Sequence, residues 1–499
     1  MVTMERGAWL LGPLAGAIAS MVLASPAIAG ICPAQVGDQI QAITRRSAVS
    51  NSQWGIVVDT LTPDSPLFPH SGAPIQRLYD QGGDRALVPA SNAKVLVTAA
   101  ALQRFGPDYR IPTSIYRMGS TEPGSPMILR VVGRGDPSLS DQQLLSLAQQ
   151  LRDQGITHID WLIGDDSYFQ GETVSASWDA EDLQAGYGAP TNSLILNQNA
   201  IGVNLYPQAV GQPLRLEWDN PNDAPGWQVR NNTTTVPRTA SEYIVVGRDM
   251  AQSILYLSGQ LWVGSEPDLS AVAVTQPGDR FLERFQQVLA EQGITVGQAE
   301  VVRASMPDPG IEIAAVESLP MAALVTEANR HSTNLYAEAL LRQLAVAENG
   351  DRARTSALQA GQEAIAAVLA PLGVDSSQFR LSDGSGLSRQ NSVTPAVLVD
   401  TLQAMGRSPD AQLYRDSLAV AGTSGTLRNR FRDTSVAGRL WGKTGTLRDV
   451  VALSGYLYPP NYDPVVFSIL VNDPNLSLGA ARQAMDDIIL TLQQLQSCS

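Results

Sequence analysis

A chain of 499 residues is too long for one ordinary hydrophobic core, so two or three domains are expected. A composition of 44% hydrophobic and 16% charged residues excludes a disordered chain, and a net charge of −14 argues against nucleic acid and anionic membrane surfaces as partners. The three histidines, His70, His158 and His331, are not spaced with cysteine or acidic residues as metal ligands are, so no metal or cofactor is expected.

The N-terminus has the pattern of an export signal. Residues 7–31 carry no charge, and Ala27-Ile28-Ala29 precedes Gly30 as in a signal-peptidase site. We therefore expect residues 1–29 to be a signal peptide and the protein to be exported to the periplasm or cell envelope, with membrane association at most peripheral. An uncleaved membrane anchor is the alternative, because the apolar run is nearly long enough to span a bilayer.

Two cysteines, Cys32 and Cys498, stand at the two ends of the mature chain. In an oxidising compartment they are expected to form a disulfide that joins the termini. The alternative is a pair of free thiols.

The first and last parts of the chain predict one α+β domain. A strand over 53–59 and its partner over 75–80 precede a helix over 91–101, which is apolar nearly all round and so is expected to be buried. Later patterns predict helices over 321–330, 335–345 and 352–372, strands over 449–458 and 464–471, and a last helix with Met485, Ile488, Ile489, Leu492 and Leu495 on one face.

Residues 113–317 have a different, more β-rich sequence pattern and are expected to be an inserted region with its own packing. They predict strands over 126–132 and 158–163, helices over 141–154 and 280–292, and β-rich tracts that include 192–206 and 242–263. We expect two small domains here, inserted into a discontinuous domain over 30–112 and 318–499.

Only two lysines, Lys94 and Lys443, occur among the 34 lysine and arginine residues. Arginine keeps its proton in proteins whereas lysine can lose it, so this usage indicates two sites that need an amine. Ser91 lies three residues before Lys94 at a helix start, which puts both side chains on one face. A buried Lys94, with its pKa lowered by a second cation at Lys443, would be a base for the Ser91 hydroxyl.

Two further motifs carry suitable chemistry. Lys443-Thr444-Gly445 is expected on an edge strand, where the glycine would let a substrate backbone approach and the other two side chains would suit a carboxylate. Ser332-Thr333-Asn334 lies between two predicted helices, where its hydroxyl would pass on a proton and its amide would hold a carbonyl. A surface lysine and a helix cap are the alternative interpretations, and the cap is the commoner role for an isolated Ser-Thr-Asn.

Together, these three motifs resemble the set found in penicillin-binding proteins and serine β-lactamases. About 240 residues separate Ser91 from Ser332, and this large insertion is similar to that of the low-molecular-mass class C penicillin-binding proteins, the D-alanyl-D-alanine carboxypeptidase/endopeptidases. Residues 135–139, 382–389 and 425–430 also resemble segments of that family, although Thr333 stands where its members commonly have Asp.

The resemblance implies a β-lactamase/DD-peptidase-like fold, an antiparallel sheet flanked by helices, with β-rich inserted domains. It also implies that Ser91 attacks the bond between two D-alanines of a peptidoglycan stem peptide, forms an acyl-enzyme, and binds penicillin covalently. Lys94 would act as base, Ser332 and Lys443 would relay the proton to the leaving amine, and Asn334 would hold the acyl amide.

The resemblance implies substrate contacts as well. Thr444 and Thr446 would bind the terminal carboxylate beside Gly445, and the N–H groups of Ser91 and Thr446 would form the oxyanion hole. The loop with Ser385, Gly386 and Arg389 would border the cleft, where Arg389 would meet the carboxylate of a diaminopimelate side chain. Asp165 would meet its amine, although a solvated loop acid is an equal alternative.

Two other functions stay open at this point. A β-lactamase would also be acylated by penicillin but would hydrolyse the adduct quickly. A wall-binding scaffold or penicillin sensor would need no active site, and the three intact motifs argue against it.

Overall fold

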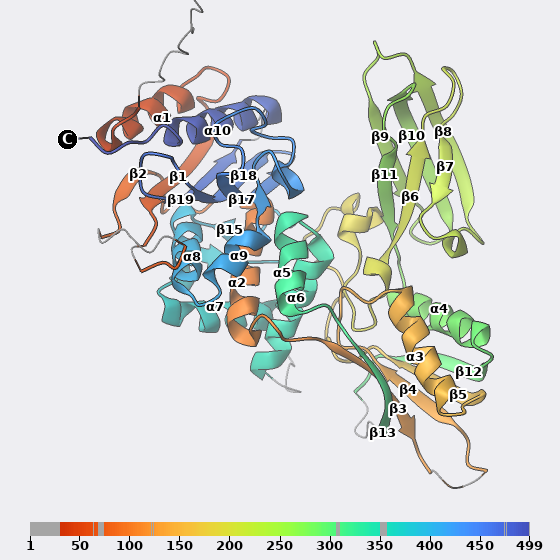
Figure 1. The fold of residues 1–499 in the computed structure, drawn as a ribbon. Helices are drawn as coiled ribbons and strands as arrows, with labels where there is room; N and C mark the ends of the chain where they lie inside the picture. Colours follow the sequence, from red (N-terminus) through yellow and green to blue (C-terminus); the bar gives the residue numbers. More distant parts are fainter. Residues whose placement is uncertain are drawn as a thin grey trace, which may run out of the picture.

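A computed structural model of the protein describes residues 30–62, 64–67, 74–120, 122, 124–305, 310–349, 357–473, 475 and 477–498 (Figure 1). The predicted signal peptide lies outside the described residues. Figure 1 shows a large unit of sheet and helices at the left, a smaller unit at the lower right, and a lobe of strands above the smaller unit.

The large unit, residues 30–111 and 318–498, is called the main unit and is built on a six-stranded antiparallel sheet. Its strand order, β16-β17-β18-β19-β1-β2, pairs strands from the end of the chain with one near its start. Every residue of β18 is buried, because helices cover both faces of the sheet. The strands are β1 (Gln53–Thr60), β2 (Arg77–Gln81), β16 (Ala419–Val420), β17 (Leu440–Leu447), β18 (Val450–Leu457) and β19 (Val465–Asn472).

Helices α1 (Val36–Thr44) and α10 (Leu478–Leu492) lie together on one face of this sheet (Figure 1). Beside them Cys32 and Cys498 form a disulfide, with their Cα atoms 5.6 Å apart. The structure thus contains the predicted cross-link. No helix among the described residues is long and apolar enough to span a membrane.

The other face is covered by a helical layer with α2 at its centre. Residues 93–102 of α2 (Ala93–Phe105) are all buried, as the apolar sequence predicts. A 3-10 turn, η2 (Ala90–Asn92), precedes α2, so the α-helix begins two residues later than predicted. The surrounding helices are α5 (Met321–Arg330), α6 (Asn334–Asn349), α7 (Ala357–Leu369), α8 (Pro395–Arg407) and α9 (Ala411–Ser417). Residues 352–356 of the helix predicted over 352–372 lie outside the described residues.

The smaller unit, called the insert base, is a five-stranded sheet in the order β12-β5-β4-β3-β13 with two helices. Its first and last strands in the chain are neighbours, and Pro112 pairs with Glu317 where the chain leaves and re-enters the main unit. The elements are β3 (Pro112–Met118), β4 (Ile128–Val132), β5 (His158–Asp165), β12 (Thr295–Val302), β13 (Ile311–Glu317), α3 (Asp141–Asp153) and α4 (Pro277–Glu291).

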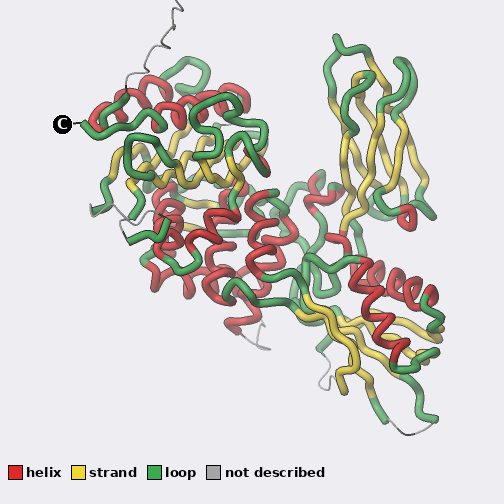
Figure 2. Tube along the Cα trace, viewed as in Figure 1, coloured by secondary structure: helices red, strands yellow, loops and turns green. Residues whose placement is uncertain are grey.

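The lobe, residues 200–273, is called the β lobe and consists almost wholly of strands and loops (Figure 2). Two three-stranded sheets, β11-β6-β7 and β8-β10-β9, enclose a core of their own. Within the β-rich tract predicted to include 192–206, the strand begins only at Ala200, because residues 197–199 have positive φ angles. The strands are β6 (Ala200–Tyr206), β7 (Arg215–Trp218), β8 (Gln228–Val236), β9 (Tyr243–Arg248), β10 (Ile254–Trp262) and β11 (Asp268–Ala273). Residues 166–199, which join the insert base to the β lobe, are called the connecting segment.

Candidate active site

Ser91 lies in η2, directly before α2, so its side chain and that of Lys94 are one helical turn apart. Lys94 Nζ donates a hydrogen bond to Ser91 Oγ at 3.1 Å. Ala90 has a φ of 47°, a conformation that alanine adopts at an energetic cost. This backbone turn therefore presents Ser91 beside the amine that the motif predicts as its base.

Lys94 is fully buried and makes two more hydrogen bonds, to Asn334 Oδ1 at 2.8 Å and to the carbonyl of Ser385 at 2.5 Å. Burial lowers the pKa of Lys94 to about 7, although the carboxylates of Asp383 and Glu338 oppose the shift. At neutral pH a substantial fraction of this amine is therefore unprotonated and able to accept a proton.

Lys443 lies on β17, fully buried, and donates to Ser332 Oγ at 2.9 Å and to the carbonyl of Thr444 at 3.0 Å. Burial, and secondly the charge of Lys94, hold the pKa of Lys443 well below its usual range. The sequence predicts that a buried site and the charge of Lys443 lower the pKa of Lys94, and burial is the largest cause of the low pKa at both lysines.

Ser332 occupies the turn between α5 and α6 with a φ of 62°, again in the left-handed region. The turn points its hydroxyl at Lys443, while Asn334 at the start of α6 reaches Lys94. The three predicted motifs thus meet at one place, joined by hydrogen bonds between Ser91, Lys94, Asn334, Ser332 and Lys443.

β17 passes close to the turn that carries Ser91. A Cβ atom on Gly445 would lie 2.9 Å from the carbonyl oxygen of Pro89, so only glycine permits this approach. Thr444 shares a hydrogen bond with Thr426 at 2.7 Å, and the exposed Thr446 accepts one from Arg482 of α10 at 3.2 Å. Both threonines therefore flank Gly445, the residue of β17 that approaches the turn of Ser91.

Like β17, the loop of residues 382–389 contacts the turn that carries Ser91. It contributes the Ser385 carbonyl to Lys94, and Gly386, with a φ of 84°, packs its Cα against the carbonyl of Ala90. Arg389 at its end forms an ion pair with Asp449 at 3.2 Å. Gly386 thus supports the turn of Ser91 by a backbone contact rather than by a side chain.

Asp165 lies elsewhere, at the end of β5, and is buried with 2% of its surface exposed. Its carboxylate forms a buried ion pair with Arg130 and accepts from the Ser167 N–H at 2.9 Å. A carboxylate engaged in this way has no free side for a substrate amine, so the contact predicted for Asp165 is left out of the site proposed below.

Sequence reasoning missed two residues that the connecting segment brings to the site. Asn334 Nδ2 donates to the carbonyl of Tyr187 at 2.9 Å, and the Tyr187 hydroxyl donates to Asp182 at 2.9 Å. Burial and the Asp182 carboxylate raise the pKa of Tyr187 to about 12. No local motif marks these residues, because the contact joins positions 147 residues apart in the chain.

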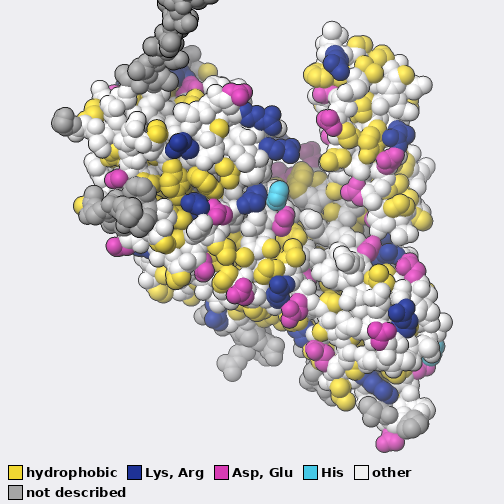
Figure 3. All heavy atoms as spheres, in the orientation of Figure 1, with side chains coloured by type: hydrophobic (Ala, Val, Ile, Leu, Met, Phe, Trp, Pro, Cys, Tyr) yellow, Lys and Arg dark blue, Asp and Glu magenta, His cyan; other side chains and the backbone are white. Residues whose placement is uncertain are grey.

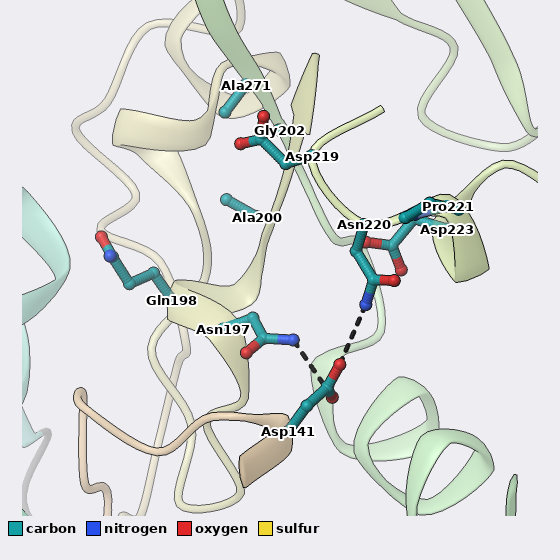
Figure 4. Close-up of a pocket in the computed structure, with 10 residues that line it drawn as sticks. All are labelled: Asp141, Asn197, Gln198, Ala200, Gly202, Asp219, Asn220, Pro221, Asp223 and Ala271. Atoms are coloured by element: carbon teal, nitrogen blue, oxygen red, sulfur yellow. Dashed lines mark hydrogen bonds between the residues drawn. The ribbon is translucent and has the colours of Figure 1, made fainter. Parts of the chain in front are cut away.

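The surface beside the main unit is hollowed toward the β lobe, and basic side chains gather on the main-unit wall (Figure 3). Because both lysines are buried, the exposed basic side chains there are arginines. A separate polar cavity of about 500 Å³ lies in the inserted region, where Asp141 accepts hydrogen bonds from Asn197 and Asn220 (Figure 4). None of the predicted site residues lines this cavity.

An antiparallel sheet between helical layers, with a serine–lysine pair at a helix start, is the architecture of serine peptidases with the β-lactamase/DD-peptidase-like fold. A profile of the D-Ala-D-Ala carboxypeptidase 3 (S13) family matches residues 36–495. The chain therefore belongs to this family of serine-type peptidases, which confirms the predicted family and fold class.

Individual relatives agree with this assignment. The chain is 30% identical to the D-alanyl-D-alanine carboxypeptidase of Actinomadura sp. (strain R39), over 93% of this chain and 86% of that protein. It is 25% identical to the D-alanyl-D-alanine carboxypeptidase DacB of Haemophilus influenzae, over 80% and 83% of the two chains. A crystal structure of penicillin binding protein 4 (dacB) from H. influenzae shares the fold, with a TM-score of 0.72 at 22% identity over 91% of this chain and 98% of that one.

Proposed function

We propose that the protein is an exported D-Ala-D-Ala carboxypeptidase, DD-endopeptidase or both, which acts on peptidoglycan stem peptides through an acyl-enzyme on Ser91. The observation that carries the proposal is the hydrogen bond from the buried Lys94 amine to Ser91 Oγ. Membership in the family and the activity for which the Actinomadura relative is named support the choice of substrate.

In the acylation step, unprotonated Lys94 takes the hydroxyl proton of Ser91 while Oγ attacks the carbonyl carbon between two D-alanines. The N–H groups of Ser91 and Thr446 stabilise the oxyanion. As the C–N bond breaks, the proton that Lys94 took passes through Ser332, which Lys443 contacts at 2.9 Å, to the leaving amine, so that Lys94 is neutral again. A water molecule then gives a proton to Lys94 and attacks the carbonyl carbon of the ester. The C–O bond to Ser91 breaks, Oγ takes the proton back from Lys94, and the shortened peptide leaves.

We assign the substrate contacts to polar side chains around this site. Thr444 and Thr446 bind the terminal carboxylate, and Asn334 holds the amide of the acyl group. Arg389 is the candidate for a carboxylate on the substrate side chain. Asp182 takes the place of Asp165 as the candidate for an amine on that side chain, because it accepts a hydrogen bond from the hydroxyl of Tyr187, whose backbone carbonyl accepts one from Asn334.

The experiment that tests the proposal uses purified protein, a fluorescent penicillin and muropeptides. Mass spectrometry should find a stable penicillin adduct on Ser91 that the Ser91→Ala variant lacks, and digestion should release D-alanine or separate cross-linked stems. Fast hydrolysis of the penicillin adduct would instead identify a β-lactamase. Absence of both D-alanine release and muropeptide cleavage would leave only the binding scaffold.

A further inference from the structure

The 382–389 loop sets the polar surroundings of Lys94, because the Ser385 carbonyl is one of three hydrogen-bond acceptors around its amine. A carbonyl oxygen at 2.5 Å from Nζ stabilises the ammonium form more than the neutral amine. The position of this loop therefore affects both where the amine points and how readily it loses its proton.

A first buried carboxylate, Glu338 on α6, holds this loop from within the main unit. Its Oε1 accepts hydrogen bonds from the N–H groups of Gly384 and Ser385, both at 2.8 Å, and Oε2 pairs with Arg342 at 3.0 Å. Only 1% of Glu338 is exposed. The N–H side of the Ser385 peptide is thus fixed by a charged group that water does not reach.

A second buried carboxylate, Asp383, holds the other half of the loop and is fully buried. It accepts from the N–H groups of Gly386 at 2.8 Å and Ser388 at 2.6 Å, and from Asn391 Nδ2 at 2.7 Å. Hydrogen bonds from neutral donors to a buried charge are stronger than those between neutral groups, so Asp383 defines the conformation of the whole turn.

The remaining donor to Asp383 comes from outside the main unit. Trp178 of the connecting segment, 8% exposed, donates its indole N–H to Asp383 Oδ2 at 2.8 Å. One residue earlier, the Ser177 hydroxyl shares a hydrogen bond of 2.6 Å with that of Ser388. The inserted region therefore completes the hydrogen bonding of a carboxylate that lies next to the catalytic amine.

We propose that Trp178 and Ser177 are positioning residues for Lys94, which act through Asp383 and the 382–389 loop. The connecting segment would thus be part of the machinery that prepares Lys94 as a base. The inference rests on the proposed function of Lys94 and extends it to residues that no motif contains.

The charges that face Lys94 come from three elements: Glu338 on α6, Asp383 in the loop and Lys443 on β17. The two carboxylates favour the ammonium and Lys443 disfavours it. A loop that moves away from Lys94 would remove both the Ser385 carbonyl and part of the field of Asp383. Both losses would lower the pKa of Lys94 and shift the onset of activity to lower pH.

The test compares Trp178→Phe with the unmodified full chain, because phenylalanine keeps an aromatic ring but lacks the N–H donor. The rate constant for acylation by a fluorescent penicillin is measured from pH 5.5 to 9.5. We expect the rate constant on the high-pH plateau to fall about tenfold, as for loss of a hydrogen bond to a charged group. We also expect the acid limb, the part of the profile where the rate rises with pH, to move to lower pH. Trp161→Phe is the control, since Trp161 is 36% exposed on β5 and should change neither value.

Ser177→Ala provides a second, smaller perturbation if thermal unfolding shows that Trp178→Phe does not fold. It should move the rate and the acid limb in the same directions. An acid limb at the wild-type position in the variant that folds would overturn the proposal, even with a slower rate, since a merely structural role changes the rate alone. Failure of the wild-type protein to be labelled on Ser91 would instead refute the proposed function.

Discussion

At the scale of single residues, the site depends on two amines that are held out of water. Lys94 and Lys443 are the lysines of the chain, and both are fully buried. Their hydrogen bonds lead to different partners, Ser91 for the first and Ser332 for the second. The separate contacts suit separate tasks, activation of the nucleophile and protonation of the leaving group.

The acylation rate should therefore depend on pH through Lys94. Its pKa of about 7 lies below the usual value, so the neutral, basic form grows as the pH rises through 7 and declines below it. We expect acylation by penicillin to increase about tenfold from pH 6 to pH 8 and then to level off. A rate independent of pH in this range would contradict the role of Lys94.

The Lys94→Arg variant keeps the positive charge but cannot supply the base, because arginine does not lose its proton. Acylation should fall by at least about 100-fold at every pH, measured as formation of the penicillin adduct. Lys443→Arg is the matched comparison, and its loss should be smaller if Lys443 serves only as a charge. Near wild-type acylation by Lys94→Arg would show that another group takes the Ser91 proton.

Two acidic residues of the inserted region should respond differently to the same change. Asp165→Asn removes the negative charge from the buried ion pair with Arg130 and should lower the free energy of unfolding by about 3–5 kcal/mol, with no change in KM. Asp182→Asn should keep stability within about 0.5 kcal/mol but raise KM for muropeptides with a diaminopimelate amine. Thermal unfolding and muropeptide kinetics separate the two outcomes, and the reverse pattern would restore Asp165 as the substrate contact.

The residue scale also shows what the sequence could predict. The three motifs and the candidate residues Thr444, Thr446 and Arg389 could be proposed from the sequence because each lies in a local segment of fixed spacing. Tyr187 and Trp178 could not, since their contacts with Asn334 and Asp383 join positions 147 and 205 residues apart.

At the scale of elements, the turn of Ser91 is held between β17 and the 382–389 loop, each through a glycine. A Cβ atom on Gly386 would lie 1.9 Å from the Ala90 carbonyl oxygen, and one on Gly445 would lie 2.9 Å from that of Pro89. These close contacts hold the backbone of the Ser91 turn on both sides, and neither glycine contributes a side chain. The strand and helix types were predictable from their apolar periods, whereas this contact depends on tertiary packing.

Replacement of Gly386 by alanine should therefore disturb both stability and acylation. The added methyl group meets backbone that cannot rotate away, and the positive φ adds strain, so we expect a loss of about 3 kcal/mol in the free energy of unfolding. Adduct formation should fall as the Ser91 turn is displaced. Gly479→Ala on α10 is the control, because a Cβ atom there meets no other atom within 4 Å. Equal free energies of unfolding for the two variants would show that the 382–389 loop can shift to accommodate the methyl group at little cost.

At the scale of the whole molecule, the chain leaves the main unit at Pro112 and returns at Glu317, which pair across β3 and β13. The inserted region is thus attached through neighbouring strands, and the connecting segment adds a second contact at Asp383. A change in sequence pattern at about residue 113 predicts an insertion. It could not predict the second contact, because the sequence of the connecting segment has no regular period.

Loss of the Cys32–Cys498 disulfide should destabilise the main unit while the site stays intact. The link closes a very long loop of the unfolded chain, so the Cys32→Ser/Cys498→Ser variant should lose up to about 5 kcal/mol of unfolding free energy. Penicillin acylation at 25 °C should stay within about twofold, because the disulfide lies beside α1 and α10 and no site residue contacts it. An unchanged melting temperature, with or without reductant, would contradict the stabilising role.

The same disulfide gives the protein the topology of a ring. A protease that cuts one exposed loop between Cys32 and Cys498 produces two fragments, yet these remain one covalent molecule. Such a nicked protein would migrate at full mass on a gel without reductant and as two bands with it. In a compartment that contains proteases, a single cut would therefore not allow the two halves of the discontinuous main unit to diffuse apart.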